Sequence, residues 1–214
     1  GQAPTPAPTD TPVPTEAGSP EPSTAPEPTS APYAGPNVTP VPKLPFKPVK
    51  ALYLKPGSYQ DEKRLQHYID LANRTEINAY VIDIKGDYGD IYYKSEIPDV
   101  VAAKACSDFD IHKVIEKFHQ NNIRVIGRIV TFKDNVITSY KPSLAIKHNG
   151  ETFVAQDGSK AQWLDPTNRG SWEYIGNIVR EAVNFGFDEI QFDYVRFPET
   201  SLYEYELQNI EEGK

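Results

Sequence analysis

Charged side chains interrupt the apolar stretch at residues 187–198, Phe-Asp-Glu-Ile-Gln-Phe-Asp-Tyr-Val-Arg-Phe-Pro. Its bulky residues favour a buried strand, with Asp193 near the carboxyl end and Pro198 as the stop. Burying a charge costs free energy unless the charge is paired or used in function. Ligands bind at the carboxyl ends of strands in parallel α/β proteins. The stretch therefore indicates the rim of an active site, where Asp193 and Arg196 could act on a bound ligand.

Arg196 could keep the Asp193 carboxylate ionised, because a nearby cation lowers the pKa of a carboxyl group. However, Arg196 lies three residues further on, and on a regular strand it points to the opposite face unless Pro198 has already ended the strand. A structural role is the alternative for Asp193. It could cap backbone amides or pair with Arg128.

Polar residues recur at the expected carboxyl ends of the other strands: Lys55 on the first, Asp83 and Lys85 on the second, and Arg128 on the third. The mouth of a barrel requires this distribution. Asp83 could accept a hydrogen bond from a substrate hydroxyl or act together with Asp193. Alternatively, it could form a buried structural ion pair with Lys85 or Arg128. Arg128 could orient a carboxylate or bind the substrate.

Other motifs carry little chemistry. Asp165 precedes Pro166 just before an expected helix, which favours fixing of the loop over catalysis. Asp87 and Asp90 lie beside glycines that favour turns. The histidines form neither His-x-His nor His-Glu-x-x-His, so no metal is predicted. No Gly-rich phosphate loop follows a strand, so no cofactor is predicted either.

Alternating strands and helices must position these residues. Apolar side chains spaced i, i+3, i+4 and i+7 predict helices, whereas short β-branched runs predict strands. We expect strands at residues 50–55, 78–84, 123–132 and 187–198. We expect helices at residues 61–74, from residue 110 and near 170–185, a long loop over 133–169, and the start of a further helix at 202–210. The helix near 170–185 is expected to end at Gly186 and to bury Trp172, Ile175, Val179 and Ala182.

Repeated strand–helix–strand units predict an α/β fold with a parallel sheet and right-handed crossovers. Either an open doubly wound sheet or a TIM-type (β/α)8 barrel would fit, and the lack of a nucleotide-binding loop favours the barrel. A barrel needs eight units and usually about 250 residues, whereas about four units follow one another here. We therefore expect the N-terminal half of a barrel, with the C-terminal half missing. Its first and fourth strands would then be open edges prone to association.

The first 48 of the 214 residues hold 15 of the 20 prolines. Such a segment buries too little apolar surface to fold, so residues 1–48 are predicted to be a disordered linker and residues 49–214 the domain. The net charge of −8 argues against nucleic acid as a partner. No run approaches the roughly 18 apolar residues of a membrane span. A Pro/Thr-rich linker before a domain favours an exported, extracellular protein tethered to the cell surface.

Four stretches resemble a known family: Asn-Ala-Tyr-Val-Ile-Asp-Ile-Lys at 78–85, Arg-Ile-Val-Thr-Phe-Lys-Asp at 128–134, Trp-Leu-Asp-Pro at 163–166, and 187–198. They are similar to the bacterial putative glycoside hydrolase domain, a (β/α)8 barrel distantly related to α-amylase-like enzymes. The resemblance covers about residues 49–198. It implies a barrel and a carbohydrate substrate, but a fold alone does not define a reaction.

Glycoside hydrolysis generally needs two carboxyl groups. The resemblance implies that Asp193 is the nucleophile of a retaining mechanism, with Asp83 as a second catalytic candidate. Aromatic rings stack on the apolar faces of sugars. The candidate substrate-binding residues are Arg128, Lys85, Arg196, Asp165, Tyr88, Trp163 and Tyr194.

Two other functions remain open at this point. Without a proton donor, the chain would be a non-catalytic glycan-binding or cell-wall-associated module on a barrel scaffold. A metal-dependent deacetylase would need a set of His and Asp ligands that the sequence does not offer. We expect the half barrel by itself to be inactive.

Overall fold

The computed structural model describes Gly1 and residues 33–39, 41–199 and 205–209. Contacts divide the chain into Gly1–Ser30 and Ala31–Lys214, and the fold is that of the second unit. Residues 2–32 and 40 of the predicted linker lie outside the described residues. Of the helix predicted to begin within 202–210, residues 205–209 are described and are not helical.

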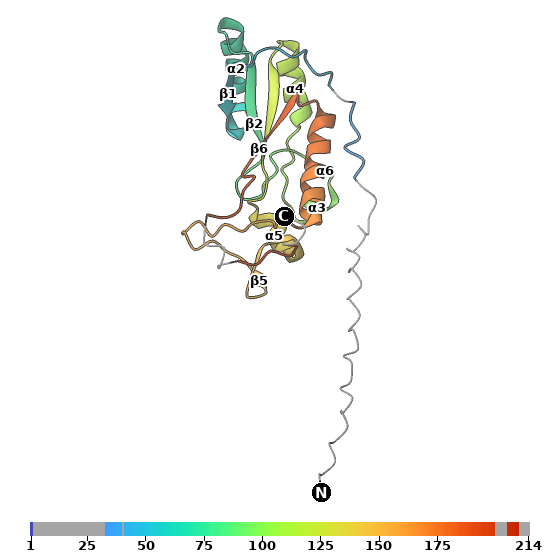
Figure 1. Cartoon of the computed structure of the whole chain (residues 1–214). Helices are drawn as coiled ribbons and strands as arrows, with labels where there is room; N and C mark the ends of the chain where they lie inside the picture. Colours follow the sequence, from blue (N-terminus) through green and yellow to red (C-terminus); the bar gives the residue numbers. More distant parts are fainter. Residues whose placement is uncertain (2–32, 40, 200–204, 210–214) are drawn as a thin grey trace. The chain divides into compact units, whose positions relative to one another are not determined.

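Four parallel strands form the main sheet (Figure 1). They are β1 (Ala51–Leu54), β2 (Ala79–Lys85), β3 (Arg124–Val130) and β6 (Glu189–Asp193). Their order is β1-β2-β3-β6. The α/β class, the parallel sheet and the four predicted strands are confirmed, and β1 and β6 form the two edges.

The edge strand β6 is less buried than predicted. Phe192 is 50% exposed, and Val195, just after the strand, is 62% exposed. An edge strand has a neighbour on one side only, and here that neighbour is β3. The regular strand ends at Asp193. The alternation of side chains along the strand therefore does not decide which way Arg196 points.

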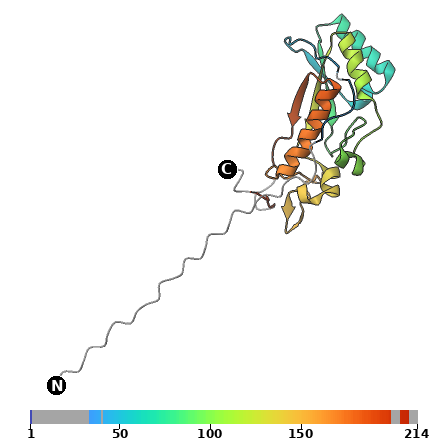
Figure 2. The same ribbon diagram turned by 90° about the vertical axis from the view of Figure 1, so that its right-hand side faces the viewer.

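Three helices cover one face of the sheet (Figure 2): α2 (Glu62–Arg74), α4 (Ile111–Gln120) and α6 (Arg169–Phe185). Each begins after a side chain that accepts a backbone N–H, respectively Asp61, Asp110 and Asn168. The last of them ends, as predicted, at Gly186 with φ 103°. Two short helices, α1 (Pro56–Tyr59) and α3 (Pro98–Ala102), were not predicted. No helix in the described part is long and apolar enough to cross a membrane.

The prediction that Trp172 lies in the core is wrong. Ile175 and Ala182 of α6 are buried, but Trp172 is 49% exposed and its indole N–H donates to the carbonyl of Pro166. It borders an open apolar groove with Phe192. The groove is lined by residues of α6, by Thr131 and Phe132 after β3, and by Phe192 of the edge strand β6.

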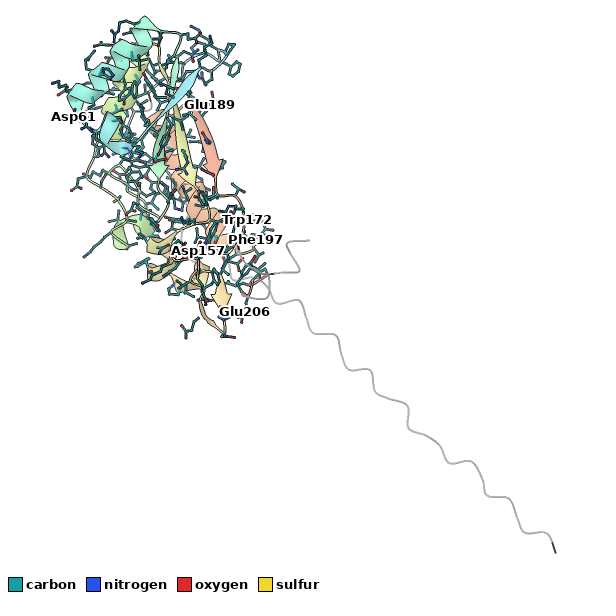
Figure 3. The ribbon with its side chains drawn as sticks, turned by 90° about the vertical axis from the view of Figure 1, so that its left-hand side faces the viewer. Asp61, Asp157, Trp172, Glu189, Phe197 and Glu206 are labelled. Carbon is teal, nitrogen blue, oxygen red and sulfur yellow. The ribbon has the colours of Figure 1, made fainter. Side chains whose placement is uncertain are left out.

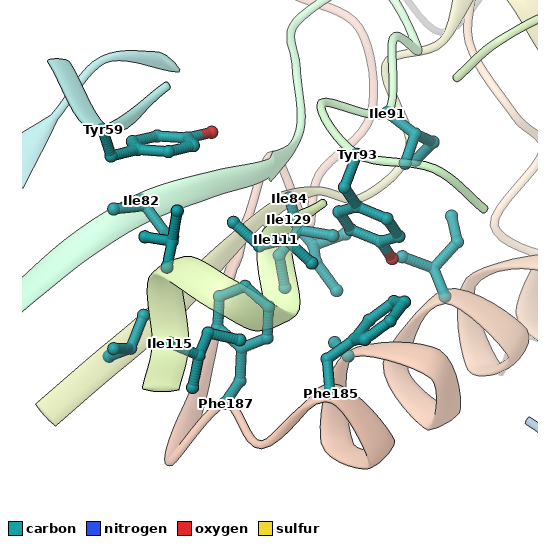
Figure 4. Packing of buried hydrophobic residues seen from close by; sticks show 14 of the residues in the cluster. Tyr59, Ile82, Ile84, Ile91, Tyr93, Ile111, Ile115, Ile129, Phe185 and Phe187 are labelled. Carbon is teal, nitrogen blue, oxygen red and sulfur yellow. The ribbon is translucent and has the colours of Figure 1, made fainter. Parts of the chain in front are cut away.

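The core lies between the helices and the sheet (Figure 4). Ile84 of β2, Ile115 of α4 and Phe187 before β6 are each at most 1% exposed. Gly127 of β3 permits this packing, because a Cβ at this position would come within 2.9 Å of the Phe187 ring. The glycine thus lets the ring rest directly on the strand.

The connection between β3 and α6 is more structured than the long loop predicted for residues 133–169. It contains α5 (Asn135–Tyr140), a 3-10 turn (Pro142–Leu144), β4 (Lys147–His148) and β5 (Glu151–Thr152). Four of its residues, Ile146, Phe153, Ala161 and Trp163, form a small second core together with Tyr205, which follows β6. This connection lies beside the carboxyl ends of the strands, because Lys133, directly after β3, forms a β-bridge with Trp163.

Residues 33–39 and 41–48, which we call the N-terminal segment, fall within the predicted linker but contact the domain. Val41 is 9% exposed, and the Leu44 N–H donates to Asp188 at 2.9 Å. Arg124 donates to the carbonyls of Leu44 and Pro45. In the structure these residues line the domain instead of extending away from it.

Candidate active site

Arg128, near the end of β3, binds three carboxylates. Its Nη1 donates to Asp83 Oδ1 at 2.9 Å. Its Nε and Nη2 both reach Asp193 Oδ2, at 2.9 and 2.7 Å. A weaker contact joins Nη2 to Asp87 Oδ1 at 3.4 Å. Side chains from β2, β3, β6 and the loop after β2 therefore meet at one guanidinium group.

The register of the sheet brings these residues together. Asp83 on β2 pairs with Arg128 on β3, and Val130 pairs with Asp193 on β6. Side chains alternate along a strand, so Asp83, Arg128 and Asp193 share the face opposite the helices. In a barrel this face is the interior, and its carboxyl end is the mouth. Glu189 lies at the other end of β6 from Asp193, away from Phe197 (Figure 3).

Both oxygens of Asp193 have partners. Oδ2 accepts from Arg128, and Oδ1 accepts from the backbone N–H of Tyr194 at 2.7 Å. Burial would raise the pKa of Asp193, but these hydrogen bonds and the charges of Arg128 and Arg196 outweigh it and hold that pKa below its ordinary value. The side chain is still 41% exposed. Asp193 is therefore an ionised carboxylate that a ligand can reach.

Asp83 is less accessible, with a side chain only 8% exposed. Its Oδ1 accepts from Arg128, and its Oδ2 accepts from the hydroxyl of Tyr53 at 2.5 Å. Burial, with a further contribution from the Asp83 hydrogen bond and charge, raises the pKa of Tyr53 to about 12, so the phenol remains a donor. The ion pair with Arg128 is one of the alternatives that the sequence left open for Asp83. The buried position of Asp83 favours a role in holding the Arg128 side chain in place.

An open cavity of about 610 Å³, the first cavity, lies over this face. Its volume is within the range of small-molecule sites. Three aromatic rings and several hydrogen-bonding groups line it, a combination suited to sugars. The lining residues are Tyr53, Val81, Asp83, Asp87, Tyr88, Tyr92, Arg128 and Gln191.

Lys85 does not lie in this cavity, contrary to the prediction that it shares the substrate-binding face. It is fully buried and binds Asp134 Oδ2 at 3.0 Å and the carbonyls of Val130 and Lys133. Burial lowers the pKa of Lys85, and the Asp134 carboxylate opposes that effect. The register shifts between Asp83 and Lys85, which takes Lys85 off the face of Asp83. Its contacts are those of a structural ion pair.

Asp165 is also buried, and its contacts fit the loop-fixing role. Oδ1 accepts from the backbone N–H and hydroxyl of Thr167, and Oδ2 accepts from the N–H of Gln208. Trp163 is only 4% exposed and belongs to the small second core. Neither residue lines the first cavity.

Arg196 forms no hydrogen bond to Asp193 among the described residues. It pairs with Glu199 at 3.1 Å, and its guanidinium lies 5.1 Å from the ring centroids of both Trp163 and Tyr194. Its charge still contributes to the lowered pKa of Asp193. Tyr88, at the rim of the first cavity, is 46% exposed.

Tyr53, Tyr92 and Gln191 were not predicted as site residues. Alternation along β1 and β6 was the available signal for Tyr53 and Gln191, because each lies on the face of Asp83 or Asp193. Asp87 was interpreted as a turn residue, and it lies in a turn while also reaching Arg128.

The described residues contain no group of three or more His, Cys, Asp or Glu side chains that could hold a metal ion. Asp83, Asp87 and Asp193 do converge, but on Arg128. A guanidinium group among three carboxylates provides the positive charge that a cation would otherwise supply.

Comparisons with known proteins agree with this architecture. Residues 51–214 match a family described as "putative glycosyl hydrolase domain". The crystal structure of a hypothetical protein from Ruminiclostridium thermocellum ATCC 27405 is 53% identical, with a TM-score of 0.66 over 69% of this chain and 78% of that one. No curated protein matches the chain.

More distant solved structures share the fold. An α-galactosidase from Thermus thermophilus is 18% identical over 71% of this chain, with a TM-score of 0.52. A maltogenic α-amylase from Thermotoga neapolitana is 17% identical over 70% of this chain, also with a TM-score of 0.52. The alignments cover 32% and 40% of those two proteins. At this identity the likeness shows the fold alone, that of a TIM-type barrel of which the described residues form part.

Proposed function

Because the chain belongs to the putative glycosyl hydrolase domain family, we propose that it is a glycoside hydrolase domain in which Asp193 is the nucleophile of a retaining mechanism. One observation carries the assignment: Asp193 is ionised, 41% exposed and paired with Arg128, which lines the first cavity; Asp193 itself is not among the lining residues. Asp83 is enclosed by Arg128 and Tyr53. Asp83 lines the first cavity but is only 8% exposed, so of the two predicted catalytic carboxylates Asp193 is the more accessible.

In the proposed reaction, Asp193 attacks the anomeric carbon of the bound sugar. The glycosidic C–O bond breaks, and the leaving oxygen takes a proton from a general acid. Water then hydrolyses the glycosyl–Asp193 ester. We place the proton donor outside residues 78–198, because no Glu in this stretch lies at the carboxyl end of a strand.

Arg128 is a positioning residue in this scheme. Its Nε donates a hydrogen bond to one oxygen of Asp193 and its Nη2 forms an ion pair with the same oxygen, while the Tyr194 N–H binds the other. Arg128 is itself fixed by Asp83. These contacts hold the carboxylate in one orientation before the substrate arrives, which lowers the entropic cost of reaching the transition state.

We further propose that the substrate is a cell-surface or environmental polysaccharide and that the protein is exported. The Pro/Thr-rich composition of residues 1–48 supports export and attachment to the cell surface through this segment. A polymeric substrate would have to be met outside the cell.

The test is the Asp193→Asn substitution in the intact protein. We expect hydrolysis of a substrate that the parent cleaves to fall by at least about a thousandfold, because a carboxamide cannot act as the nucleophile. The melting temperature should stay near that of the parent. Glu189→Gln, at the other end of β6, is the matched control and should retain activity. Parental turnover in Asp193→Asn would reject the assignment.

A second candidate function is glycan binding without turnover. The engagement of Asp193 by Arg128 favours it, since a paired carboxylate is a weaker nucleophile. The same substitution separates the two functions. A pure binding module would bind oligosaccharides without releasing products, and Asp193→Asn would leave that binding intact.

A further inference from the structure

A second cavity, of about 300 Å³, lies beside the first and shares no lining residue with it. The β3–α6 connection and the segment after β6 enclose it. It is lined by Lys133, Phe153, Ala155, Gln156, Asp157, Ser159, Ala161, Trp163, Tyr194, Arg196, Pro198 and Glu199. Its volume and its mixture of rings and hydrogen-bonding groups are those of a small polar ligand site.

Tyr194 connects this cavity to Asp193. Its φ of +52° is unusual for a residue other than glycine. In this conformation its N–H binds Asp193 Oδ1, while its ring lines the second cavity, 6.0 Å from the Trp163 ring. Backbone strain of this kind persists where the surrounding structure enforces it, and it recurs at ligand sites. The backbone conformation of Tyr194 therefore orients the Asp193 carboxylate and also places the Tyr194 ring in the wall of the second cavity.

Lys133 lies at the junction of the two cavities. Its Nζ is 4.9 Å from the ring centroid of Tyr88, which lines the first cavity, and 5.3 Å from that of Tyr194. Among the described residues, this ammonium group has no ion pair or hydrogen bond; it lies over the rings of Tyr88 and Tyr194 and acts on the Asp157 carboxylate through its charge. Its donors are free for a ligand that passes from one cavity to the other.

We propose that the second cavity is a subsite for the sugar unit next to the cleaved linkage, with Lys133 and Gln156 as hydrogen-bonding residues. The substrate is then a glycan chain of at least two units, not a simple monosaccharide glycoside. This inference rests on the proposed function, because the first cavity must hold the sugar that Asp193 attacks.

The charges indicate a neutral glycan. The lining contains two cations, Lys133 and Arg196, and two carboxylates, Asp157 and Glu199. Arg196 pairs with Glu199, and Asp157 accepts from the N–H and hydroxyl of Ser159. With a net charge of −8 on the chain, a polyanionic glycan would be repelled at long range.

The experiment measures binding by titration calorimetry in the Asp193→Asn protein, so that no probe is cleaved. The probes are malto-, chito- and galacto-oligosaccharides of one to six units, with oligogalacturonides as the anionic series. In the series that binds best, affinity should rise about tenfold or more from one unit to three, since the added unit gains hydrogen bonds to a charged group. Lys133→Met and Gln156→Ala should each remove most of that rise and leave monosaccharide affinity unchanged.

Glu151→Gln is the matched control, because Glu151 is exposed on the same connection but does not line the second cavity. It should preserve the dependence on chain length. Equal affinity for one and three units, or a rise that survives both substitutions, would overturn the subsite. Preference for oligogalacturonides would overturn the neutral class. Binding of no sugar in any series would overturn the proposed function together with the subsite.

Discussion

Arg128 controls the charge of Asp193, because its hydrogen bond is the largest of the interactions that lower the pKa of that carboxyl group and its charge adds to them. In the parent, Asp193 stays ionised down to a pH below the ordinary pKa of an aspartate side chain, about 3.9. Arg128→Gln removes the charge and the ionic hydrogen bond of Arg128, so burial, which raises the pKa of Asp193, is opposed only by the Tyr194 N–H and the charge of Arg196. We expect the acidic limb of the kcat/KM profile to move to higher pH. A nucleophile must be ionised, so activity would be lost as the pH falls through the raised pKa.

The control for this prediction is Arg196→Gln. The charge of Arg196 makes a smaller contribution, without a hydrogen bond, so its removal should shift the limb less. A carboxyl titration by NMR gives the same comparison without turnover. An unchanged limb in Arg128→Gln would contradict the positioning role assigned to Arg128.

The candidate site was predictable in part, because strand-end polarity identified Asp83, Arg128 and Asp193 without any knowledge of their contacts. Lys85 shows where that reasoning fails. A period of two assigns it to the face of Asp83, but the register shift between them sends it into the core toward Asp134. A sequence pattern does not reveal a bulge, because nothing local distinguishes a slipped residue from its neighbours.

At the scale of elements, Gly186, which caps α6, and Gly176 within it provide a stability test. Gly186 has φ 103°, and a Cβ there would come within 2.7 Å of the Val41 side chain. Gly186→Ala should therefore destabilise the fold by about 1–2 kcal/mol or more. Gly176 lies within the helix, where a Cβ would meet only Arg180 atoms at 3.9 Å. Gly176→Ala should be neutral or stabilise by up to about 1 kcal/mol.

Urea unfolding of both variants measures the two changes in free energy. Equal effects at the two positions would show that the left-handed cap and its contact with Val41 do not stabilise the domain. Since each substitution adds the same methyl group, helix propensity alone would favour both.

Elements with strong periodicity were predicted well, whereas elements defined by tertiary contacts were not. The caps at Asp110 and Gly186 are local signals, and both hold in the structure. By contrast, β4 and β5 are two residues each and exist through pairing with each other. Trp172 fits the apolar stripe of α6, but its burial would need a neighbour beyond β6 that the stripe cannot specify.

At the scale of the whole domain, the N-terminal segment contacts the amino ends of the strands, which lie opposite the site, and supplies hydrogen-bond partners there. Arg124 is buried and donates to Leu44 and Pro45, and it also binds Glu189 at 2.6 Å. The buried Glu181 accepts a hydrogen bond from Tyr33. A boundary at residue 49 would leave these polar groups with fewer partners, which costs about 1–3 kcal/mol for each group left unsatisfied.

We therefore predict that residues 49–214 are less stable than residues 31–214, by about 3 kcal/mol, or roughly 6–12 °C in Tm for a chain of this size. The shorter protein should also associate or precipitate, since β1 and β6 are open edges and Phe192 is 50% exposed. Analytical ultracentrifugation and thermal unfolding of both proteins make the comparison. Both proteins contain the two edge strands. If both associate equally, the edge strands cause the association. If only the shorter protein associates, loss of the N-terminal segment causes it. A monodisperse, equally stable monomer of residues 49–214 would contradict both causes.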